Sequence, residues 1–303
     1  MLEVKNMVKT FFKGTINEKT ALQGIDLRLE EGDFCTVIGG NGAGKSTLTD
    51  KVVKHYLDQG KKIGIVAIDP TSPFSGGAIL GDRIRMNDLT LNENVFIRSM
   101  GTRGSLGGLS KKTADVVKLM DAFGMDLIII ETVGVGQSEV DIVKNADTTL
   151  VVLVPGLGDD IQAIKAGILE IGDVFAINKA DRDGCDRLNV EIEMMLDLDS
   201  REVKWRPPIK RTIASKDQGV DELIEALDEH FEYLEDSGEL ESRRAERTRD
   251  EIIAMINEQI GRYVADKIIT SDEFNSQVAA VNERANDPYT VVNGVMTNVL
   301  KRS

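Results

Sequence analysis

The chain has 303 residues, of which 41% are hydrophobic and 29% are charged, and its formal net charge at pH 7 is −14. This composition is typical of a globular protein, and the acidic balance excludes sequence-independent nucleic-acid binding, which needs a basic surface. No apolar run is long enough to cross a bilayer and the N-terminus lacks a signal-peptide core, so we expect a cytoplasmic protein with no membrane partner.

The first predicted elements follow a strand pattern. Residues 2–10 and 21–29 alternate apolar and polar side chains, which is typical of half-exposed, antiparallel strands. Residues 30–33 predict a turn, and the apolar stretch FCTVIGG then enters a glycine-rich loop as a short strand. These features predict an N-terminal antiparallel β segment over residues 1–38.

After this loop, short apolar runs alternate with stretches of helical pattern. Buried strands separated by helices predict an α/β fold with a mainly parallel sheet covered by helices. We expect this domain over residues 39–235. The predicted strands are residues 63–68, 127–130, 150–154 and 174–177, with a further short run around 209–214.

The C-terminal part, residues 236–303, predicts a helical arm without a catalytic pattern. One face of its first helix is apolar, and we interpret this stripe as core or as a dimer interface. The stretch RRAERTR over residues 243–249 is either a patch for an anionic partner or a solvated face with salt bridges, and the acidic neighbours favour the second. The apolar stripe consists of Ile252, Met255, Ile256, Ile260 and Tyr263.

The glycine-rich loop carries a complete phosphate-binding pattern, G-x-x-x-x-G-K-S, from Gly39 to Ser46. A chance glycine turn is the alternative, but a strand precedes the loop and a helical stretch follows it. Glycines let backbone N–H groups turn onto phosphate oxygens, and a helix N-terminus favours the negative charge. Lys45 should reach the β- and γ-phosphates. The predicted phosphate-contacting residues are Gly39, Gly42, Ala43, Gly44, Lys45, Ser46 and Thr47.

A second motif predicts which base is bound. Asn178, Lys179 and Asp181 follow an apolar strand, and a carboxylate at Asp181 can accept both N1–H and the exocyclic amine of guanine, which adenine cannot offer. A strand-end turn with a helix-capping aspartate is the alternative. After the next strand, a loop containing Ala214 and Ser215 is expected to support the base.

Carboxylates and a hydroxyl are the predicted Mg²⁺ ligands. Glu131 lies at a strand tip three residues before Gly134, where it can hold the metal shell, and Ser46 supplies a hydroxyl. Asp69 and Asp82 lie on a loop rich in glycine, serine and proline. The chain's two cysteines and two histidines show no metal-ligand spacing, and we expect both histidines, His55 and His230, at the surface.

From Thr49 to about Arg249 the chain closely resembles the MeaB/ArgK-type GTPases, the methylmalonyl-CoA-mutase-associated G proteins of the SIMIBI class. The matching stretches include DPTSPFSGGAILGDRIRM, FIRSMGTRGSLGGLS, ETVGVGQSE, PGLGDDIQAIKAGILEI, NKAD, WRPP and SGELESRR. The base-supporting triplet departs from the family's usual Ser-Ala pattern, since residues 213–215 read Ile-Ala-Ser. We expect a modest effect because that loop contacts the base partly through its backbone.

The resemblance implies a GTPase that acts as a chaperone for an adenosylcobalamin-dependent methylmalonyl-CoA mutase, with Mg²⁺ and bound GTP or GDP. It implies that Asp69 and Asp82 belong to the first switch and help to organise Mg²⁺. It also implies a third switch over residues 158–165, in which Asp159, Gln162 and Lys165 respond to the nucleotide. Either Gln137 or a switch carboxylate positions the attacking water. The family also implies a homodimer built through the C-terminal arm.

Residues 1–48 instead resemble the start of an ABC-transporter ATPase. The rest of that family's pattern is missing, because the chain has no Leu-Ser-Gly-Gly-Gln signature and no Asp-Glu pair at the end of an apolar strand. The chain therefore looks chimeric, joined inside a motif that both families share. An ATP-binding transport subunit and a GTP/GDP-responsive scaffold with negligible turnover are the alternatives to a GTPase.

Overall fold

The computed structural model describes residues 3–11, 19–28, 33–39, 42–69, 87–101, 106–132, 146–156, 170–198 and 204–301. The chain divides into two compact units, Met1–Glu241 and Ser242–Ser303, and each is described by itself. In the described residues, no helix is both long and apolar enough to cross a membrane.

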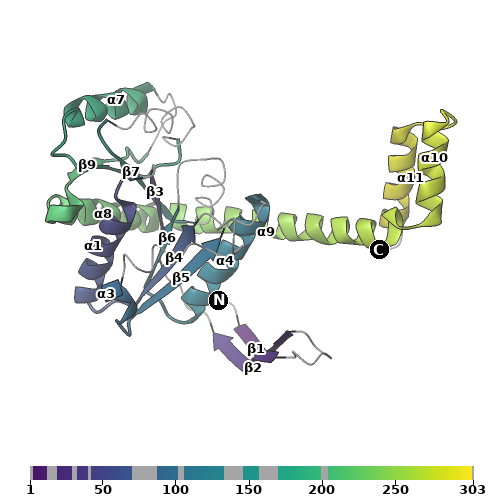
Figure 1. Ribbon diagram of the computed structural model, residues 1–303, viewed down its shortest axis with the longest axis horizontal. Coiled ribbons are helices and arrows are strands. Elements are labelled where there is room, and N and C mark those ends of the chain that lie inside the picture. Colours follow the sequence, from purple (N-terminus) through teal and green to yellow (C-terminus); the bar gives the residue numbers. More distant parts are fainter. Residues whose placement is uncertain are drawn as a thin grey trace. The chain divides into compact units, whose positions relative to one another are not determined.

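The first unit contains a seven-stranded sheet in which every neighbouring pair of strands is parallel (Figure 1). The strand order is β5-β4-β6-β3-β7-β8-β9, so the strand that leads into the phosphate loop is central. This confirms the predicted α/β fold. The strands are β3 (Asp33–Gly39), β4 (Ile63–Asp69), β5 (Val95–Gly101), β6 (Leu127–Glu131), β7 (Thr148–Leu153), β8 (Val174–Asn178) and β9 (Ile209–Thr212).

Helices cover both faces of this sheet because successive strand residues point to opposite sides. Helices α1 (Lys45–Asp58) and α8 (Val220–Ser237) pack on the face that carries Leu150 and Val152. Helix α7 (Cys185–Leu198) packs on Val151 and Leu153, and α4 (Leu106–Ala122) packs on the same opposite face beside β4 and β6. The unit also contains the short helices α3 (Asn87–Thr90) and η2 (Ala214–Lys216).

Strand β5 is an element that the sequence analysis does not predict. It pairs with β4 at the edge of the sheet, and its first four residues alternate between half-buried and exposed. An edge strand has one neighbour and is covered less completely, so Arg98 and Ser99 are tolerated within it. The apolar run that marks the inner strands is therefore interrupted here.

The N-terminal strands also form as predicted. β1 (Glu3–Phe11) and β2 (Lys19–Arg28) pair antiparallel in a separate two-stranded sheet. The predicted bounds differ from the observed ones by one or two residues at each end.

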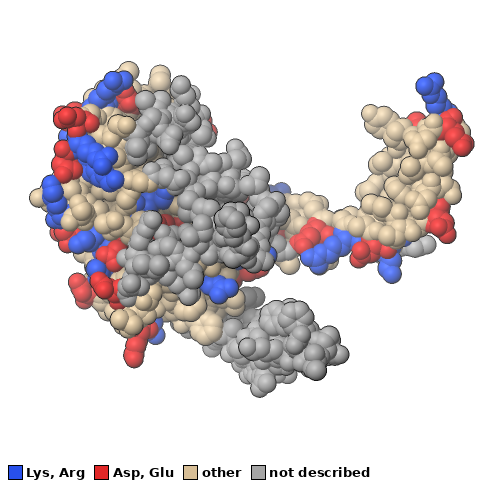
Figure 2. Space-filling view, in the orientation of Figure 1, with Lys and Arg blue, Asp and Glu red and all other residues tan. Residues whose placement is uncertain are grey.

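The second unit is helical. α9 (Glu239–Tyr263) begins shortly before the unit boundary and is followed by a π-helical turn, η3 (Val264–Ile269), and by α10 (Asp272–Asn282) and α11 (Pro288–Lys301). The apolar stripe of α9 is exposed within the single chain, by 37% at Tyr263 and 53% at Ile252, so it is not core. Figure 2 shows acidic and basic side chains next to one another on the visible part of α9. Within residues 243–249, Glu246 and Arg249 are exposed whereas Arg243, Arg244 and Arg247 are half-buried, so the choice between a solvated face and a patch for an anionic partner stays a prediction.

Candidate functional site

The described part of the phosphate loop joins β3 to α1. Gly42 and Gly44 have φ angles of 83° and 85°, which L-residues with a side chain rarely adopt. A Cβ atom on Gly44 would lie 2.5 Å from Nδ2 of Asn178, so the backbone of the loop passes directly against the start of the base-reading motif. Glycine at position 44 is therefore required both by the backbone conformation and by this close approach.

Helix α1 begins with the predicted Lys45 and Ser46. Lys45 is 93% buried, and its ammonium donates to the carbonyl of Gly39, so its charge lies along the loop itself. The helix N-terminus adds partial positive charge at the same place. This end of α1 can therefore hold an anion such as a triphosphate.

Ser46 lies beside the predicted carboxylate. Its hydroxyl donates to Oε1 of Glu131 at 2.5 Å, and Glu131 is almost fully buried at the end of β6. The two residues are 85 positions apart but meet because β6 pairs with β3, with Val37 opposite Glu131. A hydroxyl and a carboxylate oxygen are ligands that Mg²⁺ prefers, so this pair fits that ion.

Asn178 connects the phosphate loop to the loop that supports the base. Its Nδ2 donates to the carbonyl of Ala43 at 2.8 Å, while its Oδ1 accepts from the Ala214 N–H at 3.1 Å and from the Thr212 hydroxyl at 3.2 Å. Lys179 donates to the carbonyl of Gly42 at 2.8 Å. The sequence analysis places Asn178 at the nucleotide but misses this bridge, because no local pattern shows which backbone groups meet there.

The carboxylate of Asp181 is 43% exposed and is paired with the Lys216 ammonium at 2.9 Å. This hydrogen bond is the main reason why the pKa of Asp181 is lowered from its ordinary value. The carboxylate therefore stays ionised, as a group must that accepts two hydrogen bonds from guanine. Lys216 is the last residue of η2, whose Ala214 is buried and bonded to Asn178, so the structure brings the two predicted base-binding segments together.

Several predicted site residues lie outside what the structure describes. Asp69 is the last residue of β4, as Glu131 is of the parallel strand β6, but the side chain of Asp69 is among those not described. The remaining ones stay predictions from the sequence. They are Asp82, Gln137, Asp159, Gln162 and Lys165.

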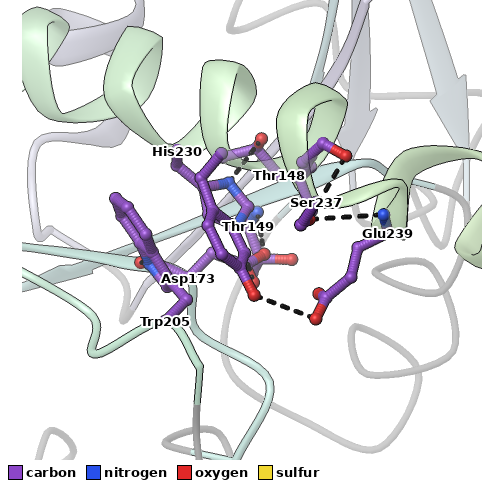
Figure 3. Close-up of polar contacts among 9 residues, drawn as sticks. Thr148, Thr149, Asp173, Trp205, His230, Ser237 and Glu239 are labelled. Atoms are coloured by element: carbon purple, nitrogen blue, oxygen red, sulfur yellow. Dashed lines mark hydrogen bonds and ion pairs between the residues drawn. The ribbon is translucent and has the colours of Figure 1, made fainter.

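The expectation that His230 lies at the surface is wrong. Its side chain is fully buried on α8, with Nδ1 2.9 Å from the Thr148 hydroxyl and Nε2 3.3 Å from Oδ1 of Asp173 (Figure 3). The ring centroid of Trp205 is 4.9 Å from that of His230, and the Trp205 indole donates to the Asp173 carbonyl. Thr148 is the first residue of β7 and Asp173 directly precedes β8. This cluster therefore lies at the amino ends of the strands, whereas the phosphate loop lies at their carboxyl ends.

The fold and the site define the protein as a P-loop GTPase. Comparisons with known proteins agree, since the sequence model of the methylmalonyl-CoA mutase-associated GTPase MeaB family matches residues 19–268. The chain belongs to this family. The match begins inside the segment that resembles an ABC-transporter ATPase, and the chimeric join remains a prediction.

Relatives and a solved structure support the same placement. The chain is 49% identical over 267 residues to a protein of Pyrococcus abyssi that is named as a GTPase. The alignment covers 87% of this chain and 82% of the relative. It is 35% identical to GTPase ArgK of Escherichia coli, covering 79% and 72%. The crystal structure of an LAO/AO transport system kinase superposes with a TM-score of 0.63 at 25% identity, covering 90% and 83%. The names of the two relatives and of the family favour a GTPase over an ABC-type transport subunit.

Proposed function

We propose that this GTPase acts as a chaperone for an adenosylcobalamin-dependent methylmalonyl-CoA mutase, using GTP hydrolysis to control loading or protection of the cofactor. The family description names association with that mutase, and a mouse relative of 38% identity is a methylmalonic aciduria type A homolog. The observation that carries the GTPase part of the proposal is the hydrogen-bonded link from the phosphate loop through Asn178 to the base-supporting loop.

We assign the predicted site residues the following roles in this reaction. The N–H groups of Gly42 to Gly44 and the Lys45 ammonium bind the phosphates, and Asp181 accepts from the guanine edge. Ser46 and Glu131 would hold Mg²⁺, together with Asp69 and Asp82. Bound Mg²⁺ supplies neutralisation of the charge that develops on the β- and γ-phosphate oxygens.

The attacking water is positioned by Gln137 or by a switch carboxylate. No arginine finger is evident in the sequence, so we propose slow intrinsic hydrolysis that the partner protein accelerates. We further propose that the exposed stripe of α9 forms a homodimer interface, because burial of apolar side chains is the main favourable term in association.

Calorimetric titration with GTP and ATP tests the base assignment. We expect GTP to bind about 100-fold more tightly or better, because guanine offers the Asp181 carboxylate two paired N–H donors that adenine cannot offer. Asp181→Asn should weaken GTP binding and favour xanthosine triphosphate, whose altered base edge complements an amide. Equal affinity of the unaltered protein for ATP and GTP would mean that Asp181 does not read the base.

Phosphate release with and without the purified mutase tests the biological role. We expect slow release by the GTPase alone and faster release when the mutase is added. Lys45→Ala is the inactive control, because it removes the ammonium group that binds the phosphates. No turnover under either condition would instead identify a nucleotide-responsive scaffold.

A further inference from the structure

A cavity of about 340 Å³ lies between α1, α8 and the sheet face that these helices cover. Its walls include Cys35 of β3, Leu127 of β6 and Thr148 of β7, which are the first or third residues of their strands. The phosphate loop follows the opposite, carboxyl end of β3. The cavity is therefore separate from the nucleotide site.

The interior of the cavity is apolar with a small number of polar groups. Val52, Leu150 and Leu227 are nearly or fully buried and line it. Thr49 also lines it, is 99% buried, and its hydroxyl has no hydrogen-bond partner among the described residues. A buried hydroxyl left unpaired is unfavourable, so this atom points to a ligand that supplies a polar group.

The mouth of the cavity carries more negative than positive charge. Asp228 and Glu232, one turn apart on α8, are exposed carboxylates in its lining, and Lys61 is the one ammonium among the described residues of the lining. The Lys61 ammonium lies 4.9 Å from the ring centre of Tyr56, whose hydroxyl donates to Asp228 at 2.6 Å. A cation at the mouth would therefore meet two carboxylates and one ammonium, which leaves a net negative charge around it.

We propose that this cavity binds a small amphipathic amine. Its apolar body lies against Val52, Leu150 and Leu227, a polar atom pairs with the Thr49 hydroxyl, and its ammonium lies at the mouth beside Asp228 and Glu232. The volume is within the range of small-molecule sites, which are mainly apolar with few placed polar groups. Charge complementarity at the mouth selects amines over carboxylic acids of the same shape.

Matched probes test the charge selection in the full-length protein. Tryptamine and indole-3-propionate share a ring but carry opposite charges, and their affinities are measured by calorimetry. We expect tryptamine to bind at least about fivefold more tightly, and Glu232→Gln to weaken tryptamine about three- to fivefold, as for partly exposed ion pairs. Equal affinities, or no binding of tryptamine, would overturn the proposal.

Two variants test the interior. Val52→Phe fills the cavity and should abolish tryptamine binding while GTP affinity is retained, because Val52 lies two helical turns from Lys45. Thr49→Val keeps the shape but removes the hydroxyl, and should weaken tryptamine about threefold or more. Since Thr49→Val leaves no new cavity, it remains informative if Val52→Phe does not fold. Unchanged tryptamine affinity in Thr49→Val would contradict the predicted pairing.

The two cysteines give an independent readout. Cys35 lines the cavity, whereas Cys185 is buried between α7 and β8, where burial raises the pKa of its thiol. We expect N-ethylmaleimide to modify Cys35 and tryptamine to slow that reaction without slowing reaction at Cys185, as measured by peptide mass spectrometry. An unreactive Cys35, or a Cys35 that tryptamine does not protect, would show that the cavity does not admit such molecules.

Discussion

Replacing Asn178 by alanine should destabilise the whole GTPase unit as well as its nucleotide site. The side chain is 98% buried and makes three hydrogen bonds, to the Ala43 carbonyl, the Ala214 N–H and the Thr212 hydroxyl. Ala43, Thr212 and Ala214 are themselves buried. The truncation therefore leaves three polar groups where water does not reach them.

The magnitude follows from these three groups. A buried polar group without a partner costs about 1 to 3 kcal/mol, and partial relaxation of the loops recovers some of the sum, so we expect a loss of about 2 to 4 kcal/mol in the free energy of unfolding. For a unit of this size, each kcal/mol lowers Tm by roughly 2 to 4 °C, so the expected decrease is about 4 to 16 °C.

Urea unfolding followed by Trp205 fluorescence measures this change. Trp205 is the only tryptophan and packs against His230 inside the first unit, so its signal reports on that unit. Asp181→Asn is the matched control, because its carboxylate is 43% exposed and should change stability by less than about 1 kcal/mol. If Asn178→Ala unfolds at the same urea concentration as the unaltered protein, the bridge does not stabilise the fold.

Three further predictions concern the site and its supporting loop. Lys216 keeps the pKa of Asp181 low, so the pKa of Asp181 should rise in Lys216→Met. As the pH is lowered, the variant should therefore lose GDP affinity at a higher pH than the unaltered protein does, as measured by titration calorimetry across pH. Superimposable curves of GDP affinity against pH would contradict this. Glu131→Gln keeps the shape of the side chain but removes its charge. It should weaken Mg²⁺ affinity, so that the Mg²⁺ concentration needed for half-maximal hydrolysis rises by about 10- to 100-fold in a metal titration. Gly219 has a φ of 70°, and a Cβ atom there would lie 2.0 Å from the Arg211 carbonyl oxygen, so Gly219→Ala should lower the unfolding free energy by about 2 to 4 kcal/mol in the same urea assay.

The strands and the phosphate loop were predictable because their signals are local. Inner strands of a parallel sheet are apolar on both faces, so β6, β7 and β8 stand out as continuous runs. The loop pattern depends on glycines at fixed spacing. The φ of 85° explains Gly44, and Gly39 is explained by the Val152 carbonyl oxygen, which would lie 2.2 Å from a Cβ atom at that position. Strand β5 was missed because an edge strand does not need such a run.

The histidine prediction failed for a related reason. Nothing adjacent to His230 in the chain shows that Thr148, Asp173 and Trp205 surround it, since these residues come from β7, from the residue before β8 and from a separate loop. A polar residue on an otherwise amphipathic helix is normally solvated. Its burial depends on partners that only the packed sheet brings together.

The sequence by itself determined the α/β class, the triphosphate loop and the candidate guanine contact at Asp181, because each depends on residue types at short, fixed spacing. Only the tertiary structure decided that Glu131 meets Ser46, that Asn178 joins two loops and that a cavity opens under α1 and α8. Those contacts span tens of residues of chain. They are set by the strand order of the sheet, which no local pattern of side chains encodes.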